Sequence, residues 1–396
     1  MHLAIEGSQA IARAVALCRP QVVAAYPITP QTHIVEGIAK LVADGEADCE
    51  VVSVESEFSA ASVALGAAAA GSRAYSASSS QGILLMTEVL YNIAGLRLPV
   101  VLTCANRTVG APINIWNDHQ DSMSVRDAGW VQIYCTDNQD AVDTTIKAYR
   151  IAERLEVPVM VCVDGFILTH LFESIDLPSQ AEVDGFLPPY HLSRMLDSRK
   201  PQTMGTLVGP EYFTETKLSL HEALQRGHEA IADADKAWEA ITGRAGGAIR
   251  IEGDPEAKVG VLCLGSVFGT LSEALEDHPE LRPLRMMALR TFRPFPVEAI
   301  KAACRGLTDL IVLERAMAPG AGAIVASEIR AALFDSPERP RVHAFAGGLG
   351  GRNLPLGTLK RLLDAIKVPE PVDFAVIDVE PDKMILDDRQ EETIHG

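Results

Sequence analysis

Between residues 20 and 165 the chain alternates short apolar segments with longer helix-compatible segments, and this alternation constrains the fold more than any other feature. The short segments run over 22–26, 50–54, 73–78, 99–105, 131–135 and 157–164. The longer segments run over 31–43, 57–70, 81–96 and 138–155. Strands that are apolar on both faces and alternate with helices are typical of a parallel sheet covered on both sides. The sequence therefore predicts an α/β domain built on a parallel sheet.

The alternation weakens after residue 170 and returns after residue 258, which predicts a second, smaller α/β domain. Residues 216–244 have the pattern of one long amphipathic helix, and the stretch after them is rich in glycine and charge, as linkers are. The predicted parts are a first domain over 1–245 with a C-terminal helical excursion, a linker over 246–257, a second domain over 258–370 and an acidic tail over 371–396.

The charge and the cysteine spacing exclude several classes of protein. The 396-residue chain has a formal net charge of −18, which argues against nucleic-acid binding, because that affinity rests on lysine and arginine neutralising phosphates. We expect no membrane span and a cytoplasmic location, since neither an apolar stretch of roughly 18 residues nor a signal-peptide pattern occurs. The seven cysteines are at least 27 residues apart, which excludes CxxC-type zinc or iron–sulfur ligation within this chain.

Polar residues follow four predicted strands at their carboxyl ends, which is where open parallel sheets bind ligands. Because these ends meet at one edge of the sheet, we expect the side chains that follow them to form a single rim. The candidates are Thr29 in YPITP, Glu55 and Glu57 in ESEFS, Ser80 and Gln81 in SSSQG, and Arg107 in NRTVG.

Each candidate, taken alone, has an ordinary structural alternative. Thr29 precedes a proline and can be a helix N-cap, and Glu57 can be a first-turn acid that favours the helix dipole. The SSSQG cluster can cap a helix or bind an anion at a helix N-terminus. Arg107 is harder to explain structurally, because a guanidinium at such a rim usually holds a carboxylate or a phosphate.

Several familiar site patterns are absent or weak, and we predict no metal site in this chain. There is no GxxxxGK[ST], no GxGxxG after the first strand and no GxSxG. The segment NDHQD (117–121) has one histidine and fits loop structure better than a metal site, and the two histidines of HEALQRGHEA fit a solvated helix face. The glycine-rich stretches GAGA and AGGLGGRNLP can cradle a phosphate, but glycine is common at such turns.

Five motifs, taken in order, resemble the alpha chain of the pyruvate:ferredoxin oxidoreductase (2-oxoacid oxidoreductase) family. They are YPITP, SEFSAASVALGAAAAG, SSSQGILLMTEVLYNIAGLRLPVV, NRTVGAPINIWNDHQDSMSVRDAGW and VPVMVCVDGF. The resemblance is dense over roughly 1–170 and thinner through 258–356. It implies that the first domain is of the thiamine-diphosphate, pyrimidine-binding type and that the second is similar to the C-terminal domain of transketolase-like enzymes.

The same resemblance implies roles for the rim residues. Glu57 matches the glutamate that contacts the aminopyrimidine ring, with Glu55 as its rival if the local alignment slips. Arg107 matches the arginine that holds the substrate carboxylate, and Thr29 matches a threonine that contacts the substrate. Ser80 and Gln81 are assigned to the cofactor. The expected reaction is the oxidative decarboxylation of a 2-oxoacid of the pyruvate type to acyl-CoA and CO₂.

Two absences then predict partner chains. We find no GDG followed by an asparagine-rich stretch, which is the magnesium–diphosphate motif of thiamine enzymes, and no clustered cysteines. The resemblance therefore implies a beta-type subunit that holds Mg²⁺ and the diphosphate, with gamma-type and ferredoxin-like subunits that carry 4Fe-4S clusters. Electrons are expected to pass to these clusters, with ferredoxin or NAD as the final acceptor.

Three alternatives stay open at this point. An aryl 2-oxoacid such as phenylglyoxylate would use the same carboxylate clamp, in a pocket that Ile113, Trp116 and Met123 could line. The chain could instead be a non-catalytic scaffold subunit whose rim residues only cap helices. The helix over 57–71, which consists almost entirely of small residues, could pack on its own sheet or against a partner subunit.

Overall fold

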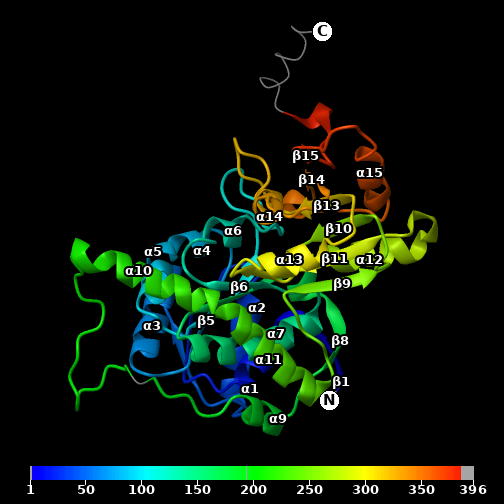
Figure 1. The fold of residues 1–396 in the computed structure, drawn as a ribbon. Helices are drawn as coiled ribbons and strands as arrows, with labels where there is room; N and C mark the ends of the chain where they lie inside the picture. The colour runs from blue at the N-terminus through cyan, green and yellow to red at the C-terminus, as the bar shows by residue number, and fades with distance from the viewer. Residues whose placement is uncertain (1, 193, 385–396) are drawn as a thin grey trace.

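The computed structural model describes residues 2–192 and 194–384. Figure 1 shows two bodies, one formed by the blue-to-green part of the chain and one by the yellow-to-red part. Each body is built on its own sheet, as the fold class predicted from the sequence requires.

The first sheet has seven strands in the order β12-β6-β7-β5-β4-β2-β3. All six strands predicted for the first domain are present: β2 (Val22–Ala25), β3 (Glu50–Ser53), β4 (Ala74–Ser78), β5 (Val101–Asn106), β6 (Val131–Tyr134) and β7 (Val159–Asp164). These six are parallel to their neighbours, so their carboxyl ends share one edge. The seventh strand, β12 (Thr291–Arg293), pairs antiparallel with β6.

Helices cover both faces of this sheet, which is why its strands are apolar on both sides. One face packs against α1 (Gly7–Leu17), α2 (Thr32–Ala43), α7 (Asn138–Leu155) and α11 (Gly227–Thr242), and its core includes Ile11, Ile38, Tyr149 and Trp238. The other face packs against α3 (Glu57–Ala69), α4 (Ser80–Leu85) and α5 (Thr87–Gly95). The alanines of α3 lie on its own sheet, which is one of the two alternatives expected for this helix.

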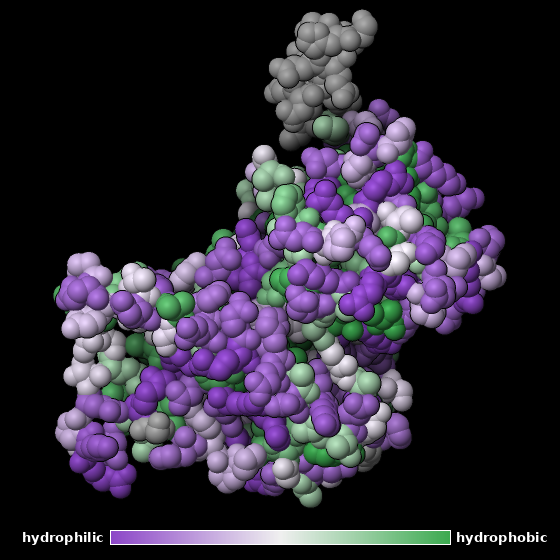
Figure 2. All heavy atoms as spheres, in the orientation of Figure 1, coloured by the Kyte–Doolittle hydropathy of each residue, from purple (hydrophilic) through white to green (hydrophobic). Residues whose placement is uncertain are grey.

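Within the described residues, the first body also contains six further elements, of which α6 is buried. They are β1 (His2–Glu6), α6 (Gln120–Ser124), α8 (Ile167–His170), β8 (Phe172–Asp176), α9 (Gln180–Phe186) and α10 (Pro210–Gln225). Strands β1 and β8 form a separate antiparallel pair. The face that carries α10 and α11 in Figure 1 is largely hydrophilic in Figure 2. Among the described helices, none combines the length and the apolar composition that crossing a membrane requires.

The second sheet has six strands in the order β15-β14-β13-β10-β11-β9. Their bounds are β9 (Ile249–Gly253), β10 (Val259–Cys263), β11 (Arg285–Leu289), β13 (Asp309–Glu314), β14 (Arg341–Ala346) and β15 (Ala375–Val376). The helices of this body are α12 (Val267–Asp277), α13 (Val297–Ala303), α14 (Val325–Leu333) and α15 (Thr358–Ala365), with short 3-10 turns at Pro279–Leu281, Leu349–Gly351 and Pro381–Lys383. Only β9 runs antiparallel to its neighbour.

Three segments differ from the expected division of the chain. The range 246–257, expected to be a linker, contains β9, because the backbone of Ile249–Gly253 finds its hydrogen-bond partners in β11. The range 291–293, expected within the second domain, forms β12 on the first sheet, where Phe292 is fully buried. The range expected to be a tail contains β15, and its part over 385–396 lies outside the described residues.

Two helices expected to be continuous each contain a break. The helix expected over 216–244 is divided between α10 and α11 at Arg226. The one expected over 81–96 is divided between α4 and α5 at Met86. Backbone hydrogen bonds of the i to i−4 type continue on both sides of each break, so each break is a local departure from helical geometry. The prediction that both segments are helical is confirmed.

Candidate functional site

The carboxyl ends of β2, β3, β4 and β5 bring the predicted rim residues to one edge of the first sheet. In the structure, and from here on, the rim means Thr29, Glu57, Ser78, Gly82 and Arg107. Thr29 and Arg107 are in contact through one hydrogen bond, while Glu57 and Ser78 lie around Gly82.

Arg107 is a buried cation at the end of β5. Its side chain donates to two backbone carbonyls, that of Thr29 over 3.0 Å and that of Asn114 over 3.2 Å. Within the described parts of the chain no carboxylate forms an ion pair with this guanidinium. Burial lowers the pKa of Arg107, and the nearby Asp121 offsets this only in part. The group is therefore a positive charge without a counter-ion, held where an anionic ligand can reach it.

Thr29 is exposed, and it is not the N-cap that the sequence left open as an alternative. Helix α2 begins at Thr32 with Gln31 at the N-cap position, and no side-chain cap hydrogen bond is formed. The YPITP segment is held by close packing instead, since a Cβ on Gly165 would lie 2.6 Å from Pro30 Cγ. The Thr29 hydroxyl is thus free for a ligand beside the Arg107 guanidinium.

Glu57 and Glu55, which the sequence could not tell apart, have different environments. Glu55 is exposed and accepts a hydrogen bond from Ser59 Oγ inside the same helix start, which lowers its pKa. Glu57 is 6% exposed, and none of the described side chains donates a hydrogen bond to it. Only Glu57 is both buried and unpaired, so only Glu57 has a reason to meet a polar ligand.

Glu57 lines a small cradle together with Ser78 and Gly82. A Cβ placed on Gly82 would lie 2.6 Å from Glu57 Oε1 and would also clash with Ser78 Oγ. Ser78 Oγ is buried and has no hydrogen-bond partner in the described part of the chain. An unpaired buried hydroxyl next to an unpaired buried carboxylate is costly in the free protein, and it indicates that a polar group fills this space.

Ser80 and Gln81, the other two residues predicted to bind the cofactor, differ in their exposure to solvent. Ser80 is fully buried with φ of 52°, and its hydroxyl is shared between the Thr108 carbonyl and the Gln81 side-chain oxygen. Its hydroxyl is therefore already occupied within the chain. The Gln81 side chain is exposed at the first turn of α4.

Asp121 forms hydrogen bonds with residues that follow β4 and with the end of β5, and the sequence pattern did not single it out. This fully buried carboxylate accepts from the backbone N–H of Ser80 (2.8 Å) and of Arg107 (3.0 Å) and from Asn106 Nδ2 (2.8 Å). Burial raises the pKa of Asp121, although each of these hydrogen bonds lowers it. Asp121 thus fixes the ends of β4 and β5 relative to each other, and its only sequence signal was its place in NDHQD.

The other residues of NDHQD make contacts within the protein. In the described residues, the one group of side chains with metal-site geometry does not include this segment. His119 lies 2.6 Å from Asp164, which also accepts from Ser266 N and from Arg315 (3.3 Å) of the second body. Burial alone would raise the pKa of Asp164, but His119 and Arg315 outweigh it and hold that pKa below its usual range. This buried network joins the two bodies close to the rim.

The residues proposed to line a substrate pocket do not behave alike. Ile113 and Trp116 are 77% and 50% exposed, and the Trp116 ring packs on Phe166 with ring centroids 4.6 Å apart. Met123 is fully buried in the apolar core, so it cannot line a pocket at the rim. The expectation for Met123 is therefore wrong, because α6 turns that side chain inward.

The glycine-rich loop of the second body packs against the first body. A Cβ on Gly351 would collide with Trp116, and Asn114 Nδ2 donates to the Gly350 carbonyl over 3.1 Å. Gly351 N also donates to the Asn117 carbonyl over 2.8 Å. These glycines permit close approach between two loops, and this contact explains them without a bound phosphate.

Comparison with known proteins gives consistent matches over most of the chain. Residues 13–236 match the family described as pyruvate flavodoxin/ferredoxin oxidoreductase, thiamine diphosphate-binding, and residues 257–358 match pyruvate:ferredoxin oxidoreductase core domain II. The chain is 42% identical to pyruvate synthase subunit PorA of Methanosarcina barkeri, with 92% of each chain covered. It is 37% identical to ketoisovalerate oxidoreductase subunit VorA of Pyrococcus abyssi, covering 92% of this chain and 93% of that one.

A solved structure shares the fold. The chain superposes on 2-oxoglutarate:ferredoxin oxidoreductase from Magnetococcus marinus, determined with 2-oxoglutarate, coenzyme A and succinyl-CoA bound, with a TM-score of 0.67 and 19% identity. The match covers 92% of this chain and 65% of that longer chain, which is just under two thirds of its length.

Proposed function

Because the chain belongs to the pyruvate flavodoxin/ferredoxin oxidoreductase family, we propose that it is the alpha subunit of a thiamine-diphosphate-dependent 2-oxoacid oxidoreductase and forms half of its active site. The proposed reaction converts one 2-oxoacid and one CoA into one acyl-CoA, one CO₂ and one proton, while two electrons pass to an iron–sulfur acceptor of the ferredoxin type. The observation that carries the proposal is the buried guanidinium of Arg107, which forms no ion pair within residues 2–192 and 194–384 and donates to the Thr29 carbonyl.

The cradle formed by Glu57, Ser78 and Gly82 fits the aminopyrimidine end of the cofactor. The Glu57 side chain is buried, the buried Ser78 hydroxyl has no hydrogen-bond partner among the described residues, and Gly82 leaves the space that a side chain would fill. When bound, thiamine diphosphate supplies the nucleophilic carbon that adds to the 2-oxo group. Glu57 would hold a proton between its carboxylate and a ring nitrogen, and Gln81 would contact the cofactor from the first turn of α4.

Arg107 and Thr29 would bind the substrate carboxylate. A guanidinium forms short, charge-assisted hydrogen bonds with a carboxylate, and the Thr29 hydroxyl adds a neutral donor beside it. Asn114 and Thr29 already anchor the arginine through their carbonyls, so little side-chain entropy remains to be lost on binding. Asp121 supports this arrangement by holding the Arg107 backbone.

The missing diphosphate site points to a partner subunit at the same edge. Large apolar side chains are exposed on and next to the rim helices: Tyr26, Phe58, Leu84, Leu85 and Tyr91. A surface of this kind, beside half of a cofactor site, fits a beta-type chain that carries Mg²⁺ and the diphosphate. Gamma-type and ferredoxin-like subunits with 4Fe-4S clusters complete the proposed complex. The seven cysteines of this chain are all free thiols, which fits a location in the reducing cytoplasm.

The substrate we propose is pyruvate or a closely related 2-oxoacid. The relatives named for pyruvate and for ketoisovalerate are similarly close to this chain, so a branched 2-oxoacid is the nearest alternative. An aryl 2-oxoacid such as phenylglyoxylate remains a further alternative, with Ile113 and Trp116 beside its ring. Turnover of the purified complex on a panel of 2-oxoacids separates these substrates.

Substitutions in the assembled complex test the catalytic role against the scaffold alternative. Glu57→Gln should lower kcat by about 10²–10⁴-fold, the range for a residue that handles a proton in the reaction. Arg107→Ala should lower kcat/KM by about 10²-fold, mainly through KM. Glu55→Gln is the matched control and should stay within about threefold of wild type, since Glu55 is exposed and bonded to Ser59. Near-normal decarboxylation in both test variants would favour a scaffold.

A second pair of variants tests the cradle by cofactor affinity. Gly82→Ala would displace Glu57 and should weaken thiamine diphosphate binding by at least about tenfold. Gly66→Ala, in α3, is the control, because a Cβ at Gly66 meets nothing within 4 Å. Equal cofactor affinity in the two variants would contradict the assignment of the cradle.

A further inference from the structure

Glu6, His33 and His170, none of which belongs to the rim, bring three possible metal ligands together. Glu6 ends β1, His33 lies in the first turn of α2 and His170 ends α8. One ligand atom from each lies within 4.8 Å of the other two. We propose that these three side chains bind a divalent transition metal ion, with Zn²⁺ as the ion that fits best. This proposal does not rest on the proposed function.

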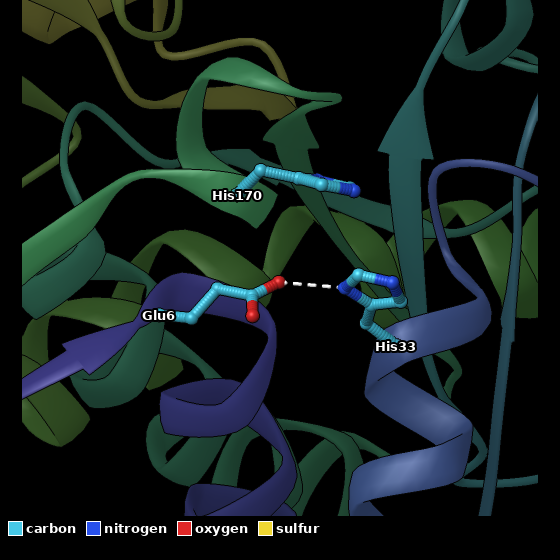
Figure 3. Close-up of side chains that lie close together, drawn as sticks. All are labelled: Glu6, His33 and His170. Atoms are coloured by element: carbon cyan, nitrogen blue, oxygen red, sulfur yellow. Dashed lines mark hydrogen bonds and ion pairs between the residues drawn. The ribbon is translucent and has the colours of Figure 1, made fainter.

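Figure 3 shows how the three side chains converge. The Glu6 carboxylate points at the His33 ring, and the His170 ring lies over both of them. Glu6 Oε1 is 2.7 Å from His33 Nδ1, and the two imidazole rings have centroids 4.7 Å apart with 33° between their planes. Tetrahedral zinc with bonds of about 2.0–2.1 Å would separate its ligand atoms by about 3.3 Å. The ion pair would have to open slightly and His170 to approach, which are side-chain rotations.

The backbone holds all three positions in place. Strands β1 and β8 pair Glu6 with Phe172, and Gly7 N donates to the Leu171 carbonyl over 3.1 Å. The end of β1 is therefore fixed next to the end of α8. Gln9 Nε2 donates to the His33 carbonyl over 3.2 Å, which links α1 to α2. The three ligands thus come from segments that the fold already fixes.

The surroundings of His170 leave one ring nitrogen for a metal. Its Nδ1 lies 2.7 Å from Thr169 Oγ1, and that oxygen also accepts from Phe166 N over 2.8 Å. In the tautomer that a metal selects, Nδ1–H donates to Thr169 and Nε2 carries the free lone pair. This outer hydrogen bond is the usual arrangement for a metal-bound histidine.

The ligand set and its exposure favour zinc. Two imidazoles and one carboxylate are a set that zinc uses in sites that keep a fourth position for water. The side chains of His33 and Glu6 are 46% and 18% exposed, so the ion has an entry path. The alternative is an ion pair between Glu6 and His33, with the His170 ring packed on Phe166 over 4.9 Å, and it leaves His170 Nε2 without a partner in the described residues.

Zinc titration of the chelator-treated full-length chain by calorimetry at neutral pH tests the proposal. We expect wild type to bind one zinc ion tightly, and we expect His33→Gln and His170→Gln each to lose at least about 100-fold in affinity. The matched control is His278→Gln, because His278 pairs with Glu280 over 3.1 Å on the surface and belongs to no such cluster in the described residues. This control should bind zinc as wild type does.

Two further measurements keep the test decisive if a histidine variant folds poorly. Zinc should raise the melting temperature of wild type and of His278→Gln but not of His33→Gln. Cobalt(II) bound to wild type should show an absorption spectrum of nitrogen and oxygen ligands, without thiolate charge transfer. Unchanged zinc binding in both histidine variants, no binding by wild type, or a thiolate spectrum from the seven cysteines would each overturn the proposal.

Discussion

The two sheets can be compared at the edges where their parallel strands end. In the first sheet, Arg107 has no counter-ion, and Glu57 and Ser78 have no hydrogen-bond partners in the described parts of the chain. At the end of β13 in the second sheet, Glu314 accepts from the backbone N–H of Ile324 and Val325, each over 2.9 Å, at the start of α14. Its neighbour Arg315 reaches across to Asp164.

This difference indicates that the edge of the first sheet binds a ligand, whereas the edge of the second sheet stabilises the structure. Buried polar groups are normally paired, so unpaired ones mark the place where a ligand supplies the missing partner. The second edge has its polar groups engaged in capping α14 and in joining the two bodies, so it stabilises the structure. If this distinction is right, substitutions at the first edge should change catalysis, and substitutions at the second edge and the junction should change stability.

Asp164→Ala should have the largest effect on stability. It removes the carboxylate that His119 and Arg315 share, leaving a buried arginine without an ion-pair partner, and should lower the free energy of unfolding by about 3–5 kcal/mol. Urea unfolding of the full chain measures this. Asp373→Ala is the control, since Asp373 is 97% exposed in its pair with Arg330 and should cost at most about 1 kcal/mol. Similar costs for both variants would mean that the junction carries no special stability.

Asp121→Asn should affect both properties, because Asp121 supports the rim from within. One carboxylate oxygen accepts from the backbone N–H groups of Ser80 and Arg107, and the other accepts from Asn106 Nδ2 and Ser122 N. An asparagine keeps only one accepting oxygen, so whichever way its amide is turned, one of these two pairs of donors loses its acceptor. We expect a loss of about 2–3 kcal/mol in unfolding free energy and at least about tenfold in kcat/KM. A stability loss with unchanged kcat/KM would place Asp121 with the structural groups and blur the comparison.

Asp118 should make stability depend on pH in the acidic range, between about pH 4 and pH 6. Burial raises the pKa of Asp118 to about 6, above the value of about 3.9 in the unfolded chain, so the folded protein binds this proton more tightly. Its stabilising contribution is fully present below about pH 4 and is lost as the pH rises through about 6, by about 2–3 kcal/mol. Asp118→Asn should remove this slope, and Asp127→Asn, whose side chain is 69% exposed, should keep it. Parallel curves for wild type and Asp118→Asn would contradict the assignment.

Glu314→Gln should have the smallest effect. The side-chain oxygen of the new glutamine can still accept from the backbone N–H groups of Ile324 and Val325. Only the longer hydrogen bond that Ala326 N donates, at 3.3 Å, is lost. We expect the free energy of unfolding, measured by thermal melting, to fall by about 1 kcal/mol. The kcat/KM of the complex should stay within about twofold of wild type. A large loss of activity here would show that the second edge takes part in catalysis after all.

Local sequence patterns were enough to predict most of the fold. The six strands of the first domain and the strand–helix alternation of the second follow from apolar runs of the right length, and the structure confirms them. The resemblance carried by five ordered motifs is confirmed by family matches over 13–236 and 257–358. Strands β1, β8, β9, β12 and β15 were missed, because each is defined by pairing with a strand that is distant in sequence.

The candidate site shows where sequence reasoning stops. The motifs identified Arg107 and Glu57 as candidates, and whether these residues act as proposed stays a prediction. Burial separates Glu57 from Glu55, and no sequence pattern carries that information. Asp121 acts on strand ends 14 and 41 residues away in sequence, so no local signal reveals its role. Met123 was misjudged, because loop residues beside a site can point either way.

The pairing of β12 with β6 has a consequence for the order in which the protein is made. The first sheet lacks its edge strand until residues 291–293 have left the ribosome, long after the other six strands have been synthesised. Until then, the edge of β6 is open and the site that buries Phe292 is empty. A nascent chain released before that point would be exposed to edge-to-edge association, so the first sheet is completed only while the second domain is being synthesised.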